Sequence, residues 1–226
     1  ICDKDEHDAT SLTVEVPDFT KALVQDVKGL RIGLPKEYFG EGIDPKVKAE
    51  IEKAVKKYQE LGAEIVEISL PHTEDAVVTY YIIAPAEASA NLARFDGIRY
   101  GYATKDYTDT EDFIRKNRSE GFGREVKRRI MIGSYVLSGK NADVYYNKAL
   151  KLRKQLTNSF KNVFENYDLI IGPTNTDVAY RLGIKQDDAL KSFYDDLLTI
   201  PVNMAGLPSM SLPVGFNSNN LPIGMQ

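Results

Sequence analysis

The order strand, amphipathic helix, strand limits the fold of this chain more than any other feature of its sequence. Residues 30–34 form a short apolar run between Gly29 and Pro35, which is typical of a buried strand. Residues 63–70 alternate apolar and polar side chains, as a strand with one buried face does. A helix that connects two such strands predicts a βαβ unit. We therefore expect an α/β fold.

The helix between these strands is marked at both ends. Asp44 suits the N-cap, Pro45 the first helical position and Gly62 the residue after the last turn. Apolar residues recur at every third or fourth position, which places them on one helix face that should pack against the sheet. These residues are Val47, Ile51, Val55, Tyr58 and Leu61.

Three further helical patterns follow. Residues 73–93 and 143–164 each predict one helix, and 111–137 predicts a helical region that is broken near Gly121 and Gly123. The pattern of residues 143–164 has an apolar stripe that we expect to face inward. Its residues are Tyr145, Ala149, Leu152, Leu156, Phe160 and Phe164.

Strand patterns return towards the end of the sequence. The apolar run 169–171 does not alternate, so we expect a strand covered on both faces, belonging to a second group of strands. Residues 209–226 contain two apolar segments separated by the polar stretch NSNN, which predicts two strands joined by a hairpin-like turn.

The composition excludes several classes of protein. The chain has 226 residues, a net charge of −4, a single Cys2 and only two histidines, His7 and His72. A disulfide framework and a zinc site built from Cys and His are therefore excluded, and direct RNA binding by this chain is not favoured. No apolar run approaches the ~20 residues of a membrane helix, and no signal peptide is recognisable, so we expect a cytoplasmic protein without membrane contact.

Common nucleotide, metal and hydrolase motifs are missing as well. The sequence has no phosphate-binding G-x-x-x-x-G-K-[ST], no G-x-G-x-x-G, no H-E-x-x-H and no G-x-S-x-G. We therefore expect no cofactor and no metal in this chain. Because it starts at Ile1 and stops inside a strand pattern, we expect it to be part of a longer chain.

Five stretches, in the same order and spanning 29–215, resemble the amidase signature family. They are GLRIGLPKEYFGEGID, EASANLARFDGIRYG, RSEGFGREVKRRIMIG, FENYDLIIGPT and PVNMAGLPSMSLPVG. The second and third are similar to the A subunits of bacterial glutamyl-tRNA(Gln)/aspartyl-tRNA(Asn) amidotransferases, whereas the fourth and fifth are shared by amidases in general. The resemblance implies a mixed β-sheet flanked by helices, with 1–226 as the C-terminal portion of an amidase domain.

The same resemblance implies an activity and its partners. Such subunits hydrolyse glutamine and supply ammonia for the ATP-dependent transamidation of misacylated tRNA in protein synthesis, which makes the complex a carbon–nitrogen ligase. The B and C subunits would complete it, with ATP and Mg²⁺ bound by a partner and tRNA bound through the complex. The family's catalytic Ser, Ser and Lys lie in a Lys segment and a Gly/Ser-rich loop that this sequence lacks. We therefore expect no catalytic residue in the chain and no activity of the chain alone.

A glutamine site needs a cation for the α-carboxylate and an anion for the α-ammonium, because unpaired buried charges are costly. Among Lys127, Arg128 and Arg129, helical geometry favours Arg129 as the inward one, about 60° from the centre of an apolar stripe at about 100° per residue. That stripe comprises Val126, Ile130, Gly133 and Leu137. The resemblance matches Arg129 to the arginine that holds the glutamine carboxylate; a structural salt bridge is the alternative.

Two more residues are matched by the resemblance. Asp196 corresponds to the ligand of the amino group, with a helix-capping or solvated aspartate as the alternative. The neighbouring Asp195 should point elsewhere. Tyr80 corresponds to a tyrosine that lines the pocket, with a half-buried core tyrosine as the alternative. Two other functions stay open: a small-amide hydrolase of the same family, and a non-catalytic interaction domain.

Overall fold

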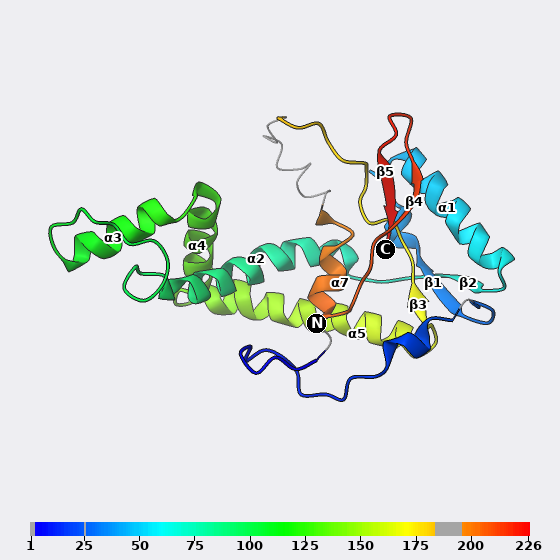
Figure 1. The fold of residues 1–226 in the computed structure, drawn as a ribbon, viewed down its shortest axis with the longest axis horizontal. Helices are drawn as coiled ribbons and strands as arrows, with labels where there is room; N and C mark the ends of the chain where they lie inside the picture. Colours follow the sequence, from blue (N-terminus) through cyan, green and yellow to red (C-terminus); the bar gives the residue numbers. More distant parts are fainter. Residues whose placement is uncertain (1–2, 25, 184–195) are drawn as a thin grey trace.

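The computed structural model describes residues 3–24, 26–183 and 196–226 (Figure 1). Cys2 and Asp195 lie outside the described residues. At one end of the molecule lies the sheet, and from it the long helices α2 and α5 run side by side towards α3 and α4 (Figure 1). The fold is α/β, as predicted.

The predicted βαβ unit is present. Strands β1 (Arg31–Pro35) and β2 (Glu64–Ile68) pair in parallel, with Ile32 opposite Ile65, and α1 (Pro45–Glu60) connects them. The carboxylate of Asp44 accepts hydrogen bonds from the backbone N–H groups of the next turn, as an N-cap should. The inward stripe of α1 is shorter than predicted.

Val47, Ile51 and Val55 are buried, but Leu61 is 52% exposed. Its placement on the inward face was wrong because α1 ends at Glu60 and Leu61 belongs to the turn that reverses at Gly62, where φ is +97°. A stripe read from spacing alone extends past the point where the helix stops.

Strand β3 (Leu169–Ile170) pairs in parallel with β1, which gives the order β2-β1-β3. We expected this segment to begin a second group of strands, but it joins the first sheet. Asp168 fixes the pairing: its backbone N–H donates to the carbonyl of Arg31 at 2.9 Å and its Oδ2 accepts from the Arg31 N–H at 2.8 Å. Full coverage was also wrong, because Leu169 is 46% exposed at the edge strand.

The final two strands form the predicted hairpin. Strands β4 (Leu212–Phe216) and β5 (Pro222–Met225) pair antiparallel, with an irregularity between Pro213 and Gly215. The backbones of Gly172 and Gln226 exchange two hydrogen bonds, at 3.0 and 2.8 Å, so the chain after β3 runs antiparallel beside β5. Parallel and antiparallel pairing therefore meet, as in a mixed sheet.

The remaining helices carry the molecule away from the sheet. They are α2 (Thr73–Asn91), α3 (Thr110–Gly121), α4 (Arg124–Leu137), a π-helical turn η4 (Ala142–Tyr146), α5 (Asn147–Phe164) and α7 (Ile200–Ala205), with short 3₁₀ turns η1 (Phe19–Ala22), η2 (Lys36–Phe39) and η3 (Leu92–Arg94). The predicted break between α3 and α4 is present. No helix in the described ranges is long and apolar enough to cross a membrane.

The predicted stripe of residues 143–164 holds only in its middle. Ala149, Leu156 and Phe160 are buried, whereas Tyr145 is 39% and Phe164 40% exposed. Tyr145 lies in the π-helical turn, whose wider winding takes it off the α-helical stripe. Phe164 ends α5 beside an open hollow described below.

Buried side chains form two clusters on opposite faces of the sheet. Ile170 and Ile171 are successive residues, so their side chains point to opposite faces, and each joins a different cluster. One cluster packs α2, α5 and α7 against the sheet and includes Leu70, Val77, Leu156, Phe160 and Leu198. The other packs α1 against the sheet and the hairpin and includes Ile32, Ile51, Ile223 and Met225.

Candidate functional site

Helices α2 and α4 approach each other closely at a glycine. A Cβ atom on Gly133 would overlap the carbonyl oxygen of Pro85, so only glycine permits this contact. Val136 is buried on the same face of α4, whereas Leu137, which we placed on the inward stripe, is 38% exposed. After Gly133 the buried stripe continues three residues on, at Val136, rather than four residues on, at Leu137 as we predicted. The close contact sets the distance at which α4 side chains meet α2.

One turn before Gly133, Arg129 reaches α2. Its Nη1 donates a hydrogen bond to the hydroxyl of Tyr80 at 3.2 Å, and its Nε donates to Oε1 of Glu125 at 3.0 Å. The Arg129 side chain is 34% exposed and that of Arg128 is 54% exposed. Arg129 therefore faces α2, in agreement with the helical geometry, while Arg128 lies nearer solvent.

Glu125 also binds the second arginine. Arg128 donates from Nε to Oε2 at 2.8 Å and from Nη2 to Oε1 at 2.7 Å, which is a bidentate ion pair. The hydrogen bonds from Arg128, and after them those from Arg129, lower the pKa of Glu125 to about 2. Hydrogen bonds to Tyr80 and then to Glu125 raise the pKa of Arg129, so this guanidinium stays charged.

The pKa of Tyr81 depends on both Arg129 and Asp196. Burial raises the pKa of Tyr81, the negative charge of Asp196 raises it further, and the positive charge of Arg129 opposes them. Tyr81 therefore lies within electrostatic reach of both charges. Its ring packs edge to face on Tyr80, with 5.3 Å between the ring centroids. The structure thus brings Arg129 and Tyr80 into contact and leaves half-buried Asp196 within electrostatic reach of Tyr81.

Sequence reasoning missed Glu125 and Tyr81. Glu125 lies four residues before Arg129 on the same helix, a spacing that predicts an ion pair and could have been used. For Tyr81 the sequence offered no signal beyond its position next to Tyr80. Only the packing of α2 against α4 shows that Tyr80 contacts Arg129 and that Tyr81 lies within reach of its charge.

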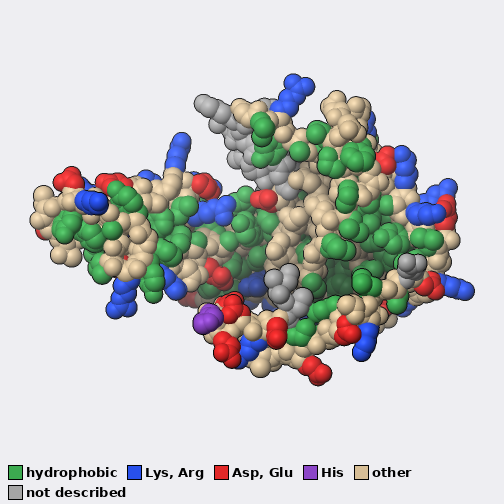
Figure 2. Space-filling model, in the orientation of Figure 1, with side chains coloured by type: hydrophobic (Ala, Val, Ile, Leu, Met, Phe, Trp, Pro, Cys, Tyr) green, Lys and Arg blue, Asp and Glu red, His purple; other side chains and the backbone are tan. Residues whose placement is uncertain are grey.

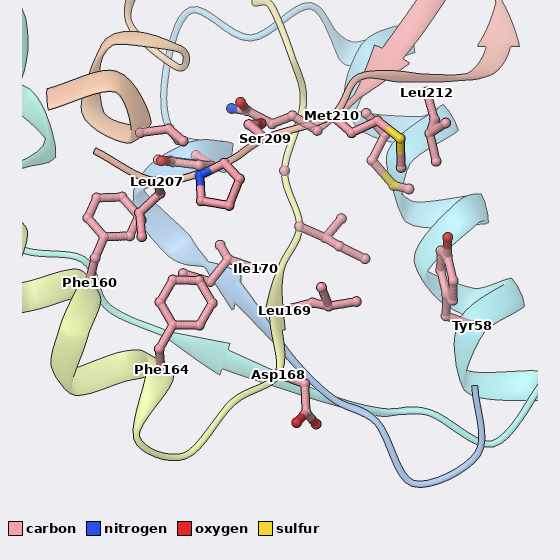
Figure 3. Close-up of a pocket in the computed structure, with 17 residues that line it drawn as sticks. Tyr58, Phe160, Phe164, Asp168, Leu169, Ile170, Leu207, Ser209, Met210 and Leu212 are labelled. Atoms are coloured by element: carbon pink, nitrogen blue, oxygen red, sulfur yellow. The ribbon is translucent and has the colours of Figure 1, made fainter. Parts of the chain in front are cut away.

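A separate hollow of about 420 Å³ lies at the sheet end of the molecule. Figure 2 shows apolar side chains gathered around it, and Figure 3 shows Phe160 and Phe164 of α5 and Leu169 and Ile170 of β3 among the residues that line it. Among the described residues no Lys or Arg lines it. The carboxylate of Asp168 at its rim is already bonded to the Arg31 N–H. The hollow therefore suits an apolar surface better than a charged amino acid.

The described residues contain no group of three or more His, Cys, Asp or Glu side chains placed to hold a metal ion. The chemistry available at the α2–α4 cluster is instead that of an anion held by a guanidinium and a phenol, near a carboxylate. A molecule that carries both a carboxylate and an ammonium group matches this arrangement.

The family model named Amidase matches residues 1–226. The chain belongs to the amidase family. It is 54% identical over 222 residues to the A subunit of glutamyl-tRNA(Gln) amidotransferase from Lactococcus lactis subsp. cremoris SK11, which covers 98% of this chain and 46% of that protein. It is 51% identical over 226 residues to the A subunit from Lacticaseibacillus casei BL23, again covering 46% of the relative. The chain thus spans about half the length of the curated relatives that it matches.

Solved structures agree with this membership. The crystal structure of the glutamyl-tRNA(Gln) amidotransferase A subunit from Thermotoga maritima superposes with a TM-score of 0.73 at 37% identity, covering 98% of this chain and 43% of that one. A bacterial aryl acylamidase of the amidase signature family gives a TM-score of 0.69 at 22% identity, covering 98% and 44%, which supports the fold alone. The family resemblance and the fold class predicted from the sequence are both confirmed.

Proposed function

We propose that this chain forms the glutamine-holding part of the A subunit of a glutamyl-tRNA(Gln) amidotransferase. Two independent observations support the proposal. The relatives with 51% and 54% identity carry that name. In the structure, Arg129 donates a hydrogen bond to Tyr80, and this contact carries the functional argument; the charges of Arg129 and Asp196 both act on the neighbouring Tyr81.

Each charged group of glutamine has a partner in this arrangement. Arg129 pairs with the α-carboxylate through its guanidinium, and the Tyr80 hydroxyl lies beside it. Asp196 pairs with the α-ammonium group. When both groups of the amino acid are held, its side-chain amide has a defined position, which is how binding residues contribute to a reaction that they do not perform. The overall reaction consumes one water molecule and leaves glutamate and ammonia.

The cleavage itself requires residues from outside this chain. A Ser nucleophile, a second Ser and a Lys, expected in an upstream Lys segment and a Gly/Ser-rich loop, would complete the site. The chain alone would therefore hydrolyse no glutamine. The B and C subunits would take the ammonia, with ATP and Mg²⁺ at a partner's site and tRNA bound through the complex, in the cytoplasm.

Residues 1–226 would then be the C-terminal portion of a larger amidase domain. The apolar hollow supports this organisation, because Leu169 of the edge strand β3 is 46% and Met210 67% exposed beside it. An uncovered strand edge with apolar neighbours invites pairing with further chain. The relatives are about twice as long as this chain, and their additional residues are candidates for the segment that covers this strand edge.

A full-length chimera provides the test. In it this chain replaces the matched segment of the Lactococcus lactis SK11 relative, and the protein is produced together with the partner subunits of that organism. We expect the chimera to hydrolyse glutamine and the chain alone to be inert. Arg129→Ala should raise the KM for glutamine by about 100-fold, the loss expected when a charge-assisted bidentate pair is removed.

The matched control is Arg124→Ala, since Arg124 is an exposed arginine at the start of the same helix. It should leave the KM unchanged. If Arg129→Ala behaves like Arg124→Ala, the pocket assignment is wrong, and a small-amide hydrolase becomes the better description. Hydrolysis by the chain alone would contradict the assignment of the catalytic residues to an upstream segment.

A further inference from the structure

The Arg129 guanidinium is held on two sides before any ligand arrives. Its Nε–H is bonded to Glu125 at 3.0 Å, and one Nη1–H is bonded to Tyr80 at 3.2 Å. An arginine has five N–H donors in a planar fork. The described contacts therefore leave one hydrogen on Nη1 and both on Nη2 for a ligand.

The position of these hydrogens selects a binding geometry. A carboxylate can grip an arginine either along the side formed by Nε and Nη2 or across the end formed by Nη1 and Nη2. Glu125 already occupies the Nε–H. The end formed by Nη1 and Nη2 is therefore the edge that Arg129 can present to a carboxylate.

Glu125 is itself fixed in place. Arg128 binds it through two hydrogen bonds, at 2.7 and 2.8 Å, so the Glu125 carboxylate has little freedom to follow Arg129 if that side chain moves. One negative charge lies between two positive ones, which leaves a net positive charge at this end of the cluster. An anionic ligand is still attracted, although a carboxylate stands next to the arginine that would bind it.

We propose that Glu125 is a positioning residue that holds the Arg129 guanidinium so that its Nη1–Nη2 edge receives the α-carboxylate of the amino-acid substrate. This inference rests on the proposed function. Glu125 would not touch the substrate. It would act by restricting the rotamers of a long side chain whose freedom otherwise lowers affinity.

A merely structural role makes a different prediction. Glu125 lies in the first turn of α4, where a negative charge stabilises a helix whatever the ligand. Removing such a charge lowers the melting temperature, and any effect on KM is then the same for every substrate. A positioning role changes the KM only for substrates that carry the α-carboxylate.

The test uses Glu125→Ala and Glu125→Gln in the full-length chimera, with glutamine and with 4-aminobutanamide, which is glutamine without its α-carboxylate. Glu125→Ala should raise the KM for glutamine by about tenfold and leave kcat within about threefold, since a ground-state contact is weakened. The KM for 4-aminobutanamide, or its inhibition constant where turnover is slow, should stay unchanged. Glu125→Gln should restore most of the affinity, because its amide oxygen can still accept from Nε.

The matched control is Glu111→Gln, which removes an exposed acid from the first turn of α3. It should change neither KM. Equal effects of Glu125→Ala on both substrates, or none on glutamine, would overturn the inference. Arg129→Ala separates the positioning role of Glu125 from the proposed function. If Arg129→Ala raises the KM for glutamine while Glu125→Ala does not, only the positioning role fails. If Arg129→Ala also has no effect, the proposed function fails with it.

Discussion

Arg129 donates a hydrogen bond from Nη1 to the hydroxyl of Tyr80, 3.2 Å away, and so joins helix α4 to helix α2. The hydroxyl oxygen accepts this bond, so its own hydrogen points elsewhere and can donate to a bound carboxylate. A cation and a phenol donor thus converge beside the carboxylate of Glu125, which already neutralises part of the charge. This convergence makes the α2–α4 cluster a better candidate for an amino-acid site than the apolar hollow at the sheet.

Tyr80→Phe tests the phenol directly. The variant keeps the ring, which packs edge to face on Tyr81, so the fold should be retained. Loss of the hydroxyl removes one partner of Arg129 and one donor to the ligand. We expect the KM for glutamine in the full-length chimera to rise by about three- to tenfold with little change in kcat. A KM equal to that of the unsubstituted chimera would show that Tyr80 is only a core residue.

Gly133→Ala tests the close packing that positions Arg129. Its Cβ would meet the backbone of Pro85, which cannot move as a flexible side chain could, so α4 must shift away from α2. We expect a loss of at least about 2 kcal/mol in the free energy of unfolding, measured by urea denaturation. The control is Gly40→Ala, whose Cβ would make only an ordinary contact and whose φ is −68°. Equal stability of the two variants would contradict the packing described for Gly133.

The Glu125 ion pairs should give a pH-dependent stability. Their hydrogen bonds hold the pKa of Glu125 at about 2, below its ordinary value of 4.5. A depressed pKa contributes stability above the ordinary pKa, and that stability is lost as the pH falls towards 2. The melting temperature of the chain should therefore exceed that of Glu125→Gln at pH 7, and the difference should shrink steadily below pH 4.5.

Because the Glu125 side chain is 56% exposed, solvent screens its ion pairs with Arg128 and Arg129. Addition of 1 M salt should therefore also reduce the difference in melting temperature between the chain and Glu125→Gln. A difference in melting temperature that is the same at pH 7 and at the acid end of the range would show that Glu125 is not stabilised by the two arginines.

Leu169→Lys tests whether the apolar hollow is covered in a longer chain. In the 226-residue chain Leu169 is 46% exposed, so a lysine there can reach water and should change the free energy of unfolding little. In the full-length chimera the same lysine should be buried without a partner, which costs several kcal/mol and should lower the melting temperature sharply. Similar small effects in both proteins would mean that no further segment covers β3.

The βαβ unit was the most predictable part of the fold. Asp44, Pro45 and Gly62 mark the helix ends through local chemistry, which a sequence displays directly. The partner of β3 was not predictable in this way, because strand order depends on contacts between segments distant in sequence. Asp168 accepts a hydrogen bond from Arg31, 137 residues earlier, and the sequence near either residue does not indicate that β3 pairs with β1.

The candidate site was likewise predictable only where a single segment determines it. The inward direction of Arg129 follows from the period of one helix, and the sequence sufficed for it. Its contact with Tyr80 and the electrostatic reach of Asp196 to Tyr81 depend on how α2, α4 and the segment that precedes α7 meet, which no single segment encodes. Glutamine binding by Arg129, Tyr80 and Asp196 stays a prediction.

Kinetics with trimmed substrates address glutamine binding itself. The full-length chimera, Arg129→Ala and Asp196→Asn are each assayed with glutamine, with 4-aminobutanamide, which lacks the α-carboxylate, and with 5-amino-5-oxopentanoate, which lacks the α-ammonium group. We predict that Arg129→Ala weakens only substrates with the carboxylate, and Asp196→Asn only those with the ammonium group, each by about tenfold or more in kcat/KM. Losses that do not depend on which charge the substrate carries would contradict this assignment of the two charges.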